Sequence, residues 1–223
     1  MVTLAHRRRH FQIDPDTKFL LHCNGTDEST DFIDDSSYEL TVTANGGAQI
    51  DTAQYKLGGA SGLLNGSSAY LSLASSAVWV TTTCTIEAWI RLASASGYQT
   101  IIGRYQDTGN RWIWMWNGTG WDLPGAASSI SDPISPETWQ INTWHHVAYV
   151  LSEGTGYLYR DGTEIGSIAS SIANITGELW IGKYGYPGDA RYFNGHIDEV
   201  RWSSSVRYPT DFTPQTTEFS KYK

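Results

Sequence analysis

Carboxylate side chains are the groups through which a sugar-cleaving site would work, because retaining glycoside hydrolysis needs two of them about 5–5.5 Å apart. A Glu-x-Asp-x-Glu run on one strand supplies such a pair, since alternate residues share a face of the sheet. None of the nine glutamates starts such a run. Glu87 stands alone in its segment, and the adjacent Asp198 and Glu199 are expected on opposite faces. The sequence therefore predicts that the chain is not an enzyme.

Motifs for other kinds of chemistry are equally sparse. The chain has no Gly-x-Ser-x-Gly elbow and no Cys-x-x-Cys pair. His145 and His146 are neighbours on an expected strand and diverge, which predicts packing and hydrogen bonding rather than a shared metal. Cys23 and Cys84 lie in apolar runs, which favours buried free thiols over a disulfide. Asp107 is expected in a tight turn, where its carboxylate accepts local N–H groups.

Aromatic side chains are the second group with binding chemistry, because their rings stack on the apolar faces of sugars. The chain has 10 Trp and 13 Tyr. In "RWIWMWNGTGW" (111–121), Trp112, Trp114 and Trp116 project to one side, and the central Trp114 is expected in the core. The segment "YGYPGDARYF" (184–193) is the favoured contact loop. The rings expected to bind a ligand lie at strand ends or near predicted turns: Trp116, Trp121, Trp139, Tyr184, Tyr186 and Tyr192.

Strands must hold these side chains, because helix signals are nearly absent. Short alternating runs separated by Gly, Asn, Asp and Ser recur along the chain and predict an all-β, two-sheet antiparallel sandwich. We expect an N-terminal arm (1–17), one domain (18–212) and a C-terminal tail (213–223). The expected strands are 18–23, 38–43, 48–50, 62–64, 69–73, 84–92, 99–104, 112–116, 120–123, 144–152, 156–160, 163–169, 179–181 and 197–203.

Turn signals complete this outline. Asp161-Gly162 separates two alternating runs and predicts a type I′ hairpin turn, and Asn65-Gly66 and Asn117-Gly118 are expected to behave in the same way. The segment 122–142 contains three prolines and is the longest expected loop. Loops at the ends of rigid sandwiches often carry binding function, so this loop is a candidate contact region.

Charge and hydropathy exclude several partners. The net charge of −8 argues against nucleic acid, because phosphate binding needs a basic surface. The one basic cluster, residues 6–10, is expected to be a solvated arm, or an arm that touches an acidic neighbour. No stretch approaches the roughly 18 apolar residues of a membrane span, so no membrane insertion is expected. The N-terminus lacks an apolar h-region, which predicts no secretory signal.

Six segments, taken in order, resemble a laminin G-like, or concanavalin A-like, jelly roll. The resemblance implies the fold with two sheets packed face to face. The segments are "CTIEAWI" (84–90), "TIIGRY" (100–105), "TWHHVAYV" (143–150), "GYLYRDGTEIG" (156–166), "LWIGKYG" (179–185) and "FNGHIDEVRWSSSVRY" (193–208).

The first part of the chain extends this resemblance. Residues 20–37 and 42–73 are similar to the beginning of such domains in bacteriophage and marine viral structural proteins. The resemblance covers roughly residues 18–212. It departs from the family at Cys23 and Cys84, where Phe is more common, and at Asn24, where Asp is more common.

The resemblance also implies a structural Ca²⁺ ion. Sandwiches of this type often hold Ca²⁺ between the exit of the first strand and an Asp on the last strand, and the matching positions are Asn24, Asp27 and Asp198. Hard oxygen ligands of this kind suit Ca²⁺. As an alternative, Arg201 or Arg207 would neutralise Asp198, and the Asn at position 24 weakens the match.

The absence of catalytic motifs predicts a non-enzymatic protein, and the resemblance implies a bacteriophage virion protein in a tail, fibre or capsid-decoration role. Its expected work is adhesion to cell-surface polysaccharide, through weak sites that act in many copies. A purely structural particle protein, which would bind other virion subunits and form homo-oligomers, is the alternative interpretation. A polysaccharide-degrading enzyme with an unrecognised site is the third.

Overall fold

The computed structural model describes residues 12–126, 130–131, 139–172, 174–186, 188 and 191–222. The basic cluster 6–10 of the predicted arm lies outside this range. The described residues form fifteen strands and one short 3-10 helix. Their bounds are β1 (Thr17–Leu21), β2 (Val42–Asn45), β3 (Gln49–Asp51), β4 (Ser61–Asn65), β5 (Tyr70–Leu73), η1 (Ala77–Trp79), β6 (Cys84–Leu92), β7 (Gln99–Asp107), β8 (Asn110–Trp116), β9 (Gly120–Asp122), β10 (Ile130–Ser131), β11 (His145–Ser152), β12 (Thr155–Arg160), β13 (Thr163–Ala169), β14 (Glu178–Ile181) and β15 (Asn194–Ser203).

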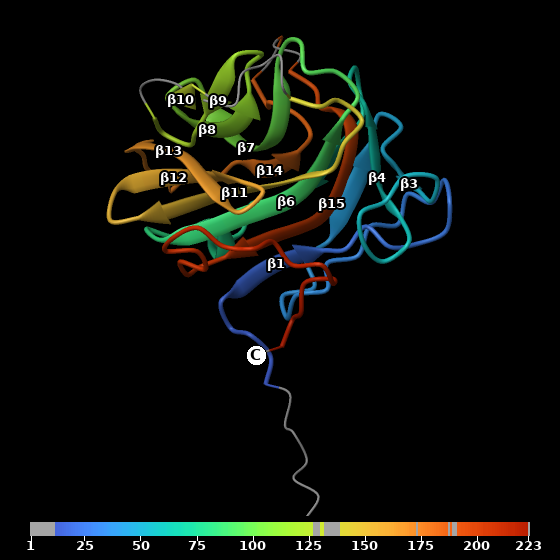
Figure 1. Cartoon of the computed structure of the whole chain (residues 1–223), viewed down its shortest axis with the longest axis horizontal. Coiled ribbons are helices and arrows are strands. Elements are labelled where there is room, and N and C mark those ends of the chain that lie inside the picture. The colour runs from blue at the N-terminus through green and yellow to red at the C-terminus, as the bar shows by residue number, and fades with distance from the viewer. Residues whose placement is uncertain are drawn as a thin grey trace, which may run out of the picture.

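Two antiparallel sheets lie face to face (Figure 1). The 8-stranded sheet has the order β13-β12-β11-β6-β15-β4-β3, with β1 also paired to β15. The 7-stranded sheet has the order β10-β9-β8-β7-β14-β5-β2. Strands far apart in sequence therefore lie side by side, as β6 with β15 and β7 with β14. This is the two-sheet jelly-roll sandwich that the alternation and the resemblance predict.

One hydrophobic core fills the space between the sheets. In the 7-stranded sheet, Leu71, Ile181, Ile102 and Trp114 lie opposite one another along a row of paired strands, and all four are buried in this core. Side chains alternate between the faces of a strand, so Ser72 and Trp180, the residues next to Leu71 and Ile181, point to the outer side of the sheet. The core positions of Leu71, Ile181, Ile102 and Trp114 therefore determine which residues of these strands are on the outer face of the sheet.

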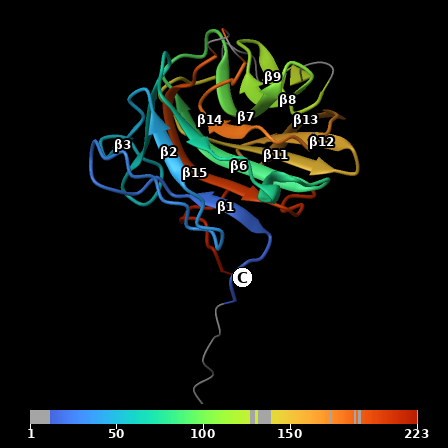
Figure 2. The ribbon, with the colours of Figure 1, turned by 180° about the vertical axis from the view of Figure 1, so that it is seen from behind.

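The C-terminal segment 204–222 covers part of the outer side of the 8-stranded sheet. Phe219 is 2% exposed, and Tyr208 stacks on Phe212 with a centroid distance of 3.5 Å. The backbone N–H of Asp14 donates to the carbonyl of Lys221, which brings the two described ends of the chain together below the sheet (Figure 2). The segment predicted as a tail (213–223) is thus packed against the domain over the residues that the structure describes.

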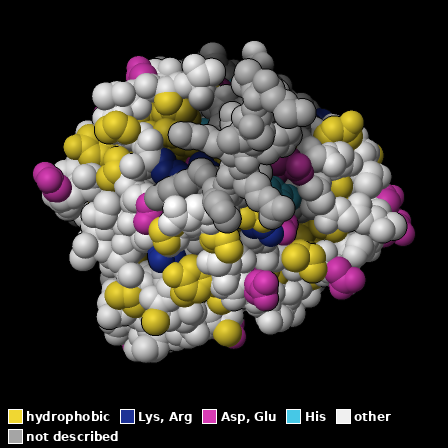
Figure 3. Space-filling view, turned by 90° about the horizontal axis from the view of Figure 1, so that it is seen from below, with side chains coloured by type: hydrophobic (Ala, Val, Ile, Leu, Met, Phe, Trp, Pro, Cys, Tyr) yellow, Lys and Arg dark blue, Asp and Glu magenta, His cyan; other side chains and the backbone are white. Residues whose placement is uncertain are grey.

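The side of the molecule that carries the chain ends shows no single large apolar area among its described residues. Hydrophobic side chains lie there in small separate groups between polar atoms (Figure 3). Among the described residues, no helix has the length and apolar character needed to span a membrane.

The turn predictions hold in part. Asp161 and Gly162 both have positive φ (50° and 84°), as a type I′ turn requires. The other two turns differ from the prediction, because only their glycines have positive φ. Asn65 and Asn117 instead accept backbone N–H groups two or more residues further on through their Oδ1 atoms, which closes the turn by a side chain.

Several smaller predictions are confirmed. Cys23 and Cys84 are buried free thiols. His145 bonds Asp161 while His146 bonds Glu87, so the two rings diverge. Oδ1 of Asp107 accepts the N–H groups of residues 109 and 110 in a tight turn.

Candidate functional site

Seven of the described aromatic side chains gather over the outer side of the 7-stranded sheet, and we call this set the aromatic face. Leu179 and Ile181 are in the core, so Trp180 between them points outward. Arg104 points inward opposite Trp112, so Tyr105 points outward. The members of the aromatic face are Tyr70, Tyr98, Tyr105, Trp180, Tyr184, Tyr186 and Tyr192.

Trp180 is held in one position at the centre of this face. Its Nε1–H donates to Oε2 of Glu178 at 3.1 Å. A Cβ at Gly185 would lie 1.2 Å from the Cζ3 atom of the indole, so only glycine lets the ring take this place. The strand position, the hydrogen bond and the glycine together pre-organise a half-buried indole, as a binding surface requires.

The chain after β14 folds back on itself and brings further rings to the face. Gly182 has a φ of 84°, and it donates to the carbonyl of Ile101. Lys183 pairs with Tyr192 in an isolated bridge, and the Tyr184 N–H donates to the carbonyl of Arg191. The two arms of this turn therefore present their side chains next to Trp180.

The rings form a row in contact. Trp180 and Tyr105 are nearly parallel, with an interplanar angle of 19° and a centroid distance of 6.5 Å. Tyr105 meets Tyr186 edge to face at 5.7 Å, and Tyr186 stacks against Tyr184 at 6.1 Å. These contacts restrict the side-chain conformations of the rings before a ligand binds. Binding to the row would therefore cost little further side-chain entropy.

Cations are interleaved with the rings. The guanidinium of Arg111 lies 5.3 Å from the ring centroid of Tyr186. That of Arg191 lies 4.3 Å from Tyr98 and 5.1 Å from Tyr184. These distances are within the range of cation–π attraction.

The structure separates the predicted binding rings into two groups. Tyr184, Tyr186 and Tyr192 come together on the aromatic face, although Tyr184 is only 7% exposed. The expected exposure of the other three rings is wrong: Trp116 and Trp121 are 0% exposed and Trp139 is 4% exposed. They pack on one another at centroid distances of 5.5 to 5.7 Å and belong to the core.

The rings that sequence reasoning missed are Tyr70, Tyr98, Tyr105 and Trp180. The signal for Trp180 was present, because the predicted strand 179–181 with Leu179 and Ile181 inward places Trp180 outward. The strand position of Tyr105 carries the same information.

An irregularity in β15 determines the side on which Asp198 lies. The register of β15 against β6 shifts between Asp198 and Arg201, and Glu199 has a φ of 51°, as in a β-bulge. Asp198 is therefore opposite Trp89, outside the core, whereas Val200 and Trp202 point into the core. Strict alternation cannot anticipate an inserted residue of this kind.

The three predicted calcium ligands approach one loop, residues 52–58, at different points. Asp198 Oδ2 accepts the N–H groups of Lys56 and Leu57, Asp27 accepts from Thr52, and Asn24 Oδ1 lies beside Gly58. Burial raises the pKa of Asp198 to about 7, with a lesser effect from the Glu199 charge.

A cation would fit one atom of this set well. Asp198 Oδ1 is buried and has no described hydrogen-bond partner, as expected for an oxygen that a hard cation could use. The alternative neutralisation does not occur: Arg201 pairs with Glu87, and Arg207 pairs with Asp14. Asp198 would contribute this oxygen, whereas Asp27 Oδ1 already accepts from Thr52 and Asn24 contacts Glu218.

Another acidic cluster lies next to this loop. His22, Glu199 and Glu218 have ligand atoms within 4.8 Å of one another. His22 Nδ1 is 2.7 Å from Glu199 Oε1, and the Phe219 N–H donates to Glu199 Oε2. Burial lowers the pKa of His22, but the neighbouring carboxylates outweigh it and raise the pKa overall. The contacts fasten the C-terminal segment to β15, which is a structural role.

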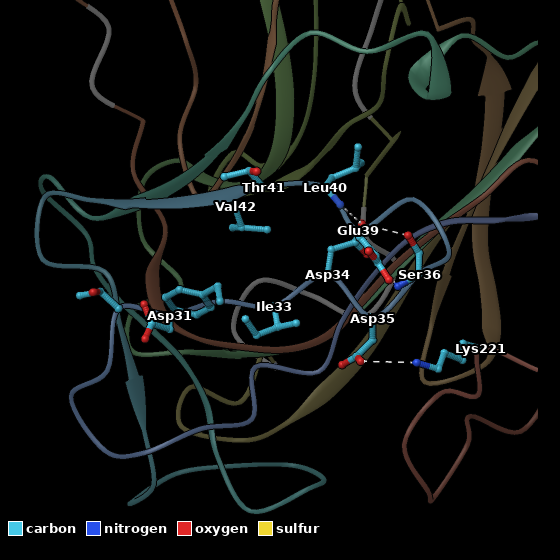
Figure 4. A pocket seen from close by; sticks show the side chains of 12 residues that line it. Asp31, Ile33, Asp34, Asp35, Ser36, Glu39, Leu40, Thr41, Val42 and Lys221 are labelled. Atoms are coloured by element: carbon cyan, nitrogen blue, oxygen red, sulfur yellow. Dashed lines mark hydrogen bonds and ion pairs between the residues drawn. The ribbon is translucent and has the colours of Figure 1, made fainter.

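A hollow of about 560 Å³ lies along residues 30–42 (Figure 4). Two of the carboxylates that line it, Asp34 and Asp35, already have partners. Asp34 accepts the N–H groups of Leu20, Ser36 and Leu40, and Asp35 lies 3.8 Å from Lys221. These contacts shape the loop, whereas the aromatic face presents rings that are held in place for a ligand, so the aromatic face is the stronger candidate site.

The fold and this site define a class: a lectin-like jelly-roll sandwich with aromatic rings on the outer side of one sheet. The family model described as the concanavalin A-like lectin/glucanases superfamily (Laminin_G_3) matches residues 65–211, more than half of the chain. The chain belongs to this superfamily. The comparison with curated proteins gives no match.

Solved structures share the fold at low identity. Domain 4 of AbnA, a GH43 extracellular arabinanase from Geobacillus stearothermophilus in complex with arabinotriose, is 17% identical with a TM-score of 0.58, over 86% of this chain and 93% of that one. The binding domain of botulinum neurotoxin DC in complex with SialylT is 15% identical (TM-score 0.61), over 86% and 48%. Trypanosoma rangeli sialidase in complex with sialic acid is 14% identical (TM-score 0.64), over 86% and 31%. The chain thus spans about half of the toxin chain and a third of the sialidase chain.

Proposed function

We propose that the chain is a non-enzymatic carbohydrate-binding module that uses the aromatic face. The single observation that carries the proposal is the fixed row of rings around Trp180, which is pre-organised by Gly185 and Glu178. Sugars expose apolar C–H faces that stack on such rings. The solved structures with arabinotriose, SialylT and sialic acid support the same class of ligand.

Polar groups beside the rings support the proposal. Ser72 pairs with Trp180 across the two strands, and Asn45 Nδ2 donates to Ser72 Oγ at 3.0 Å. Sugars need such hydroxyl and amide partners because their own hydroxyl groups must remain hydrogen-bonded when they leave water.

The direct experiment is a glycan array probed with the chain displayed in many copies on a bead. Weak single sites then bind through avidity. We expect binding to a defined set of saccharides. Complete absence of binding, on an array that a control lectin does bind, would remove the proposal.

We further propose that Asp198 holds a structural Ca²⁺ ion with Asn24 and Asp27 near it. The support is the buried Oδ1 atom of Asp198 without a described partner. Adding about 1 mM Ca²⁺ to chelator-treated protein should raise the melting temperature by a few degrees, because a ligand that binds only the folded state stabilises it. The Asp198→Asn variant should not respond. A melting temperature of the unmodified chain that Ca²⁺ leaves unchanged would refute this proposal.

A place in a bacteriophage particle, as tail, fibre or capsid decoration, is also our proposal. It is supported by the resemblance of residues 20–37 and 42–73 to viral structural proteins. In such a particle, many copies would turn weak sugar binding into firm adhesion to a cell surface. Mass spectrometry of purified particles tests the location.

A further inference from the structure

Lys183 occupies a special position in the aromatic face. Its Nζ lies 4.2 Å from the ring centroid of Tyr70, 5.4 Å from that of Trp180 and 5.8 Å from that of Tyr192. Within the described part of the chain, these rings are the contacts of its ammonium group, and no carboxylate forms an ion pair with it. A strongly hydrated ammonium held between rings keeps its charge available for a ligand.

Cations lie against the rings of the aromatic face, although the whole chain is acidic. Lys183, Arg111 and Arg191 contact rings of the face, whereas the chain carries a net charge of −8. On the same side, Glu178 receives the Trp180 N–H, and Asp107 lies near Arg111. Within the described part of the chain, Asp122 lies beside Arg191, opposite Met115, so Lys183 is the cation of this face that would attract an anion.

The strands on either side of Trp180 carry small residues opposite it. Gly103 is the residue opposite Trp180 on β7 and adds no side chain of its own beside the indole. Ser72 is the neighbour on the other side. A sugar ring lying on the indole would thus have a flat surface beneath it, hydrogen-bonding groups on one side and the ammonium of Lys183 close by.

We propose that the ligand of this face is an anionic saccharide, in which the sugar ring stacks on Trp180 and a carboxylate or sulfate group pairs with Lys183. This inference rests on the proposed function and adds the chemical class of the ligand. A carboxylate or sulfate is attached within one or two bonds of a pyranose ring. The 5.4 Å between the Lys183 Nζ and the Trp180 centroid therefore suits a single sugar unit that touches both.

The test is an array that carries acidic glycans beside their neutral counterparts: sialylated and desialylated oligosaccharides, oligogalacturonates and their methyl esters, and sulfated and desulfated galactans. It is probed with the unmodified chain, with Lys183→Met and with the control Lys56→Met. Lys56 also lies over an indole, 4.0 Å from the ring centroid of Trp89, but away from the aromatic face. Methionine keeps an unbranched apolar stem and removes the charge. An oligoglutamate peptide tests whether charge alone is sufficient.

We expect the unmodified chain to prefer the acidic member of at least one pair by about tenfold, the effect of one charge-assisted hydrogen bond. Lys183→Met should remove this preference, and Lys56→Met should keep it. The carboxylated and sulfated arms show which anion is bound. Equal binding to acidic and neutral partners, a preference that Lys183→Met retains, or equally strong binding of oligoglutamate would overturn the inference while sugar binding stands. Binding to no glycan at all would overturn the proposed function itself.

Discussion

Replacing Glu87 by Gln is expected to lower the free energy of unfolding by about 3–5 kcal/mol, the usual result of removing one partner from a buried ion pair. Glu87 is 0% exposed, and its Oε1 lies 2.7 Å from an Arg201 nitrogen. Its Oε2 accepts from Tyr208 at 2.6 Å and lies 3.1 Å from His146 Nε2. Gln keeps the shape but leaves the Arg201 charge buried without a counter-charge. Urea unfolding measures the change.

The control for this prediction is Glu164→Gln. Glu164 is exposed on β13, so its substitution should change the stability by less than about 0.5 kcal/mol. A loss below about 1 kcal/mol for Glu87→Gln would show that the network around Glu87 contributes little.

The same carboxyl group predicts how stability depends on pH. Burial alone would raise the pKa of Glu87, but the Arg201 charge and the hydrogen bonds from His146 and Tyr208 outweigh it and lower the pKa from 4.5 to about 2. The folded state therefore holds this proton less tightly than the unfolded state. Its stabilisation is complete above pH 4.5 and is lost as the pH falls from 4.5 to 2. The stability difference between the unmodified chain and Glu87→Gln should shrink over this range.

Replacing Trp180 by Ala should weaken glycan binding at least tenfold, because buried tryptophans at the centre of a binding surface carry a large share of the affinity. Trp180→Phe keeps a ring and should retain part of the affinity. Gly185→Ala leaves the indole in the chain but forces it out of its place, so it should also weaken binding. Isothermal titration with a glycan selected on the array gives these affinities.

The matched control is Tyr55→Ala. Tyr55 is 51% exposed and lies on the loop before β4, which belongs to the other sheet. Unchanged affinity in Trp180→Ala, or an equal loss in Tyr55→Ala, would place the sugar elsewhere. Circular dichroism confirms that each variant is folded.

Local pattern was sufficient for the strands but not for the site. β6 and β13 begin and end at the predicted residues, because alternation and turn signals are both local. Trp121 was expected to be exposed because a loop follows it, yet Trp139 from beyond that loop packs on it at 5.5 Å. The burial of Trp121 depends on a tertiary contact with Trp139, which the sequence around Trp121 does not predict.

Two further features of the molecule also could not be predicted from local sequence. The β-bulge at Glu199 places Asp198 on the outer side of β15. The alternation of polar and apolar residues in the sequence does not predict such an inserted residue. The aromatic face joins Tyr70, Tyr105 and Trp180 across three strands, so the sequence predicted only the members in residues 184–192. Their outward direction could be predicted, whereas their mutual contact depends on the order of the strands.

Nuclear magnetic resonance titration of the isotope-labelled chain with a glycan selected on the array tests the central claim most directly. The indole N–H of Trp180 and the backbone amides of β14 and of residues 183–186 should shift together as the glycan is added. The amides around the hollow at residues 30–42 should not move. Shifts confined to that hollow, with the Trp180 signal unchanged, would contradict binding at the aromatic face.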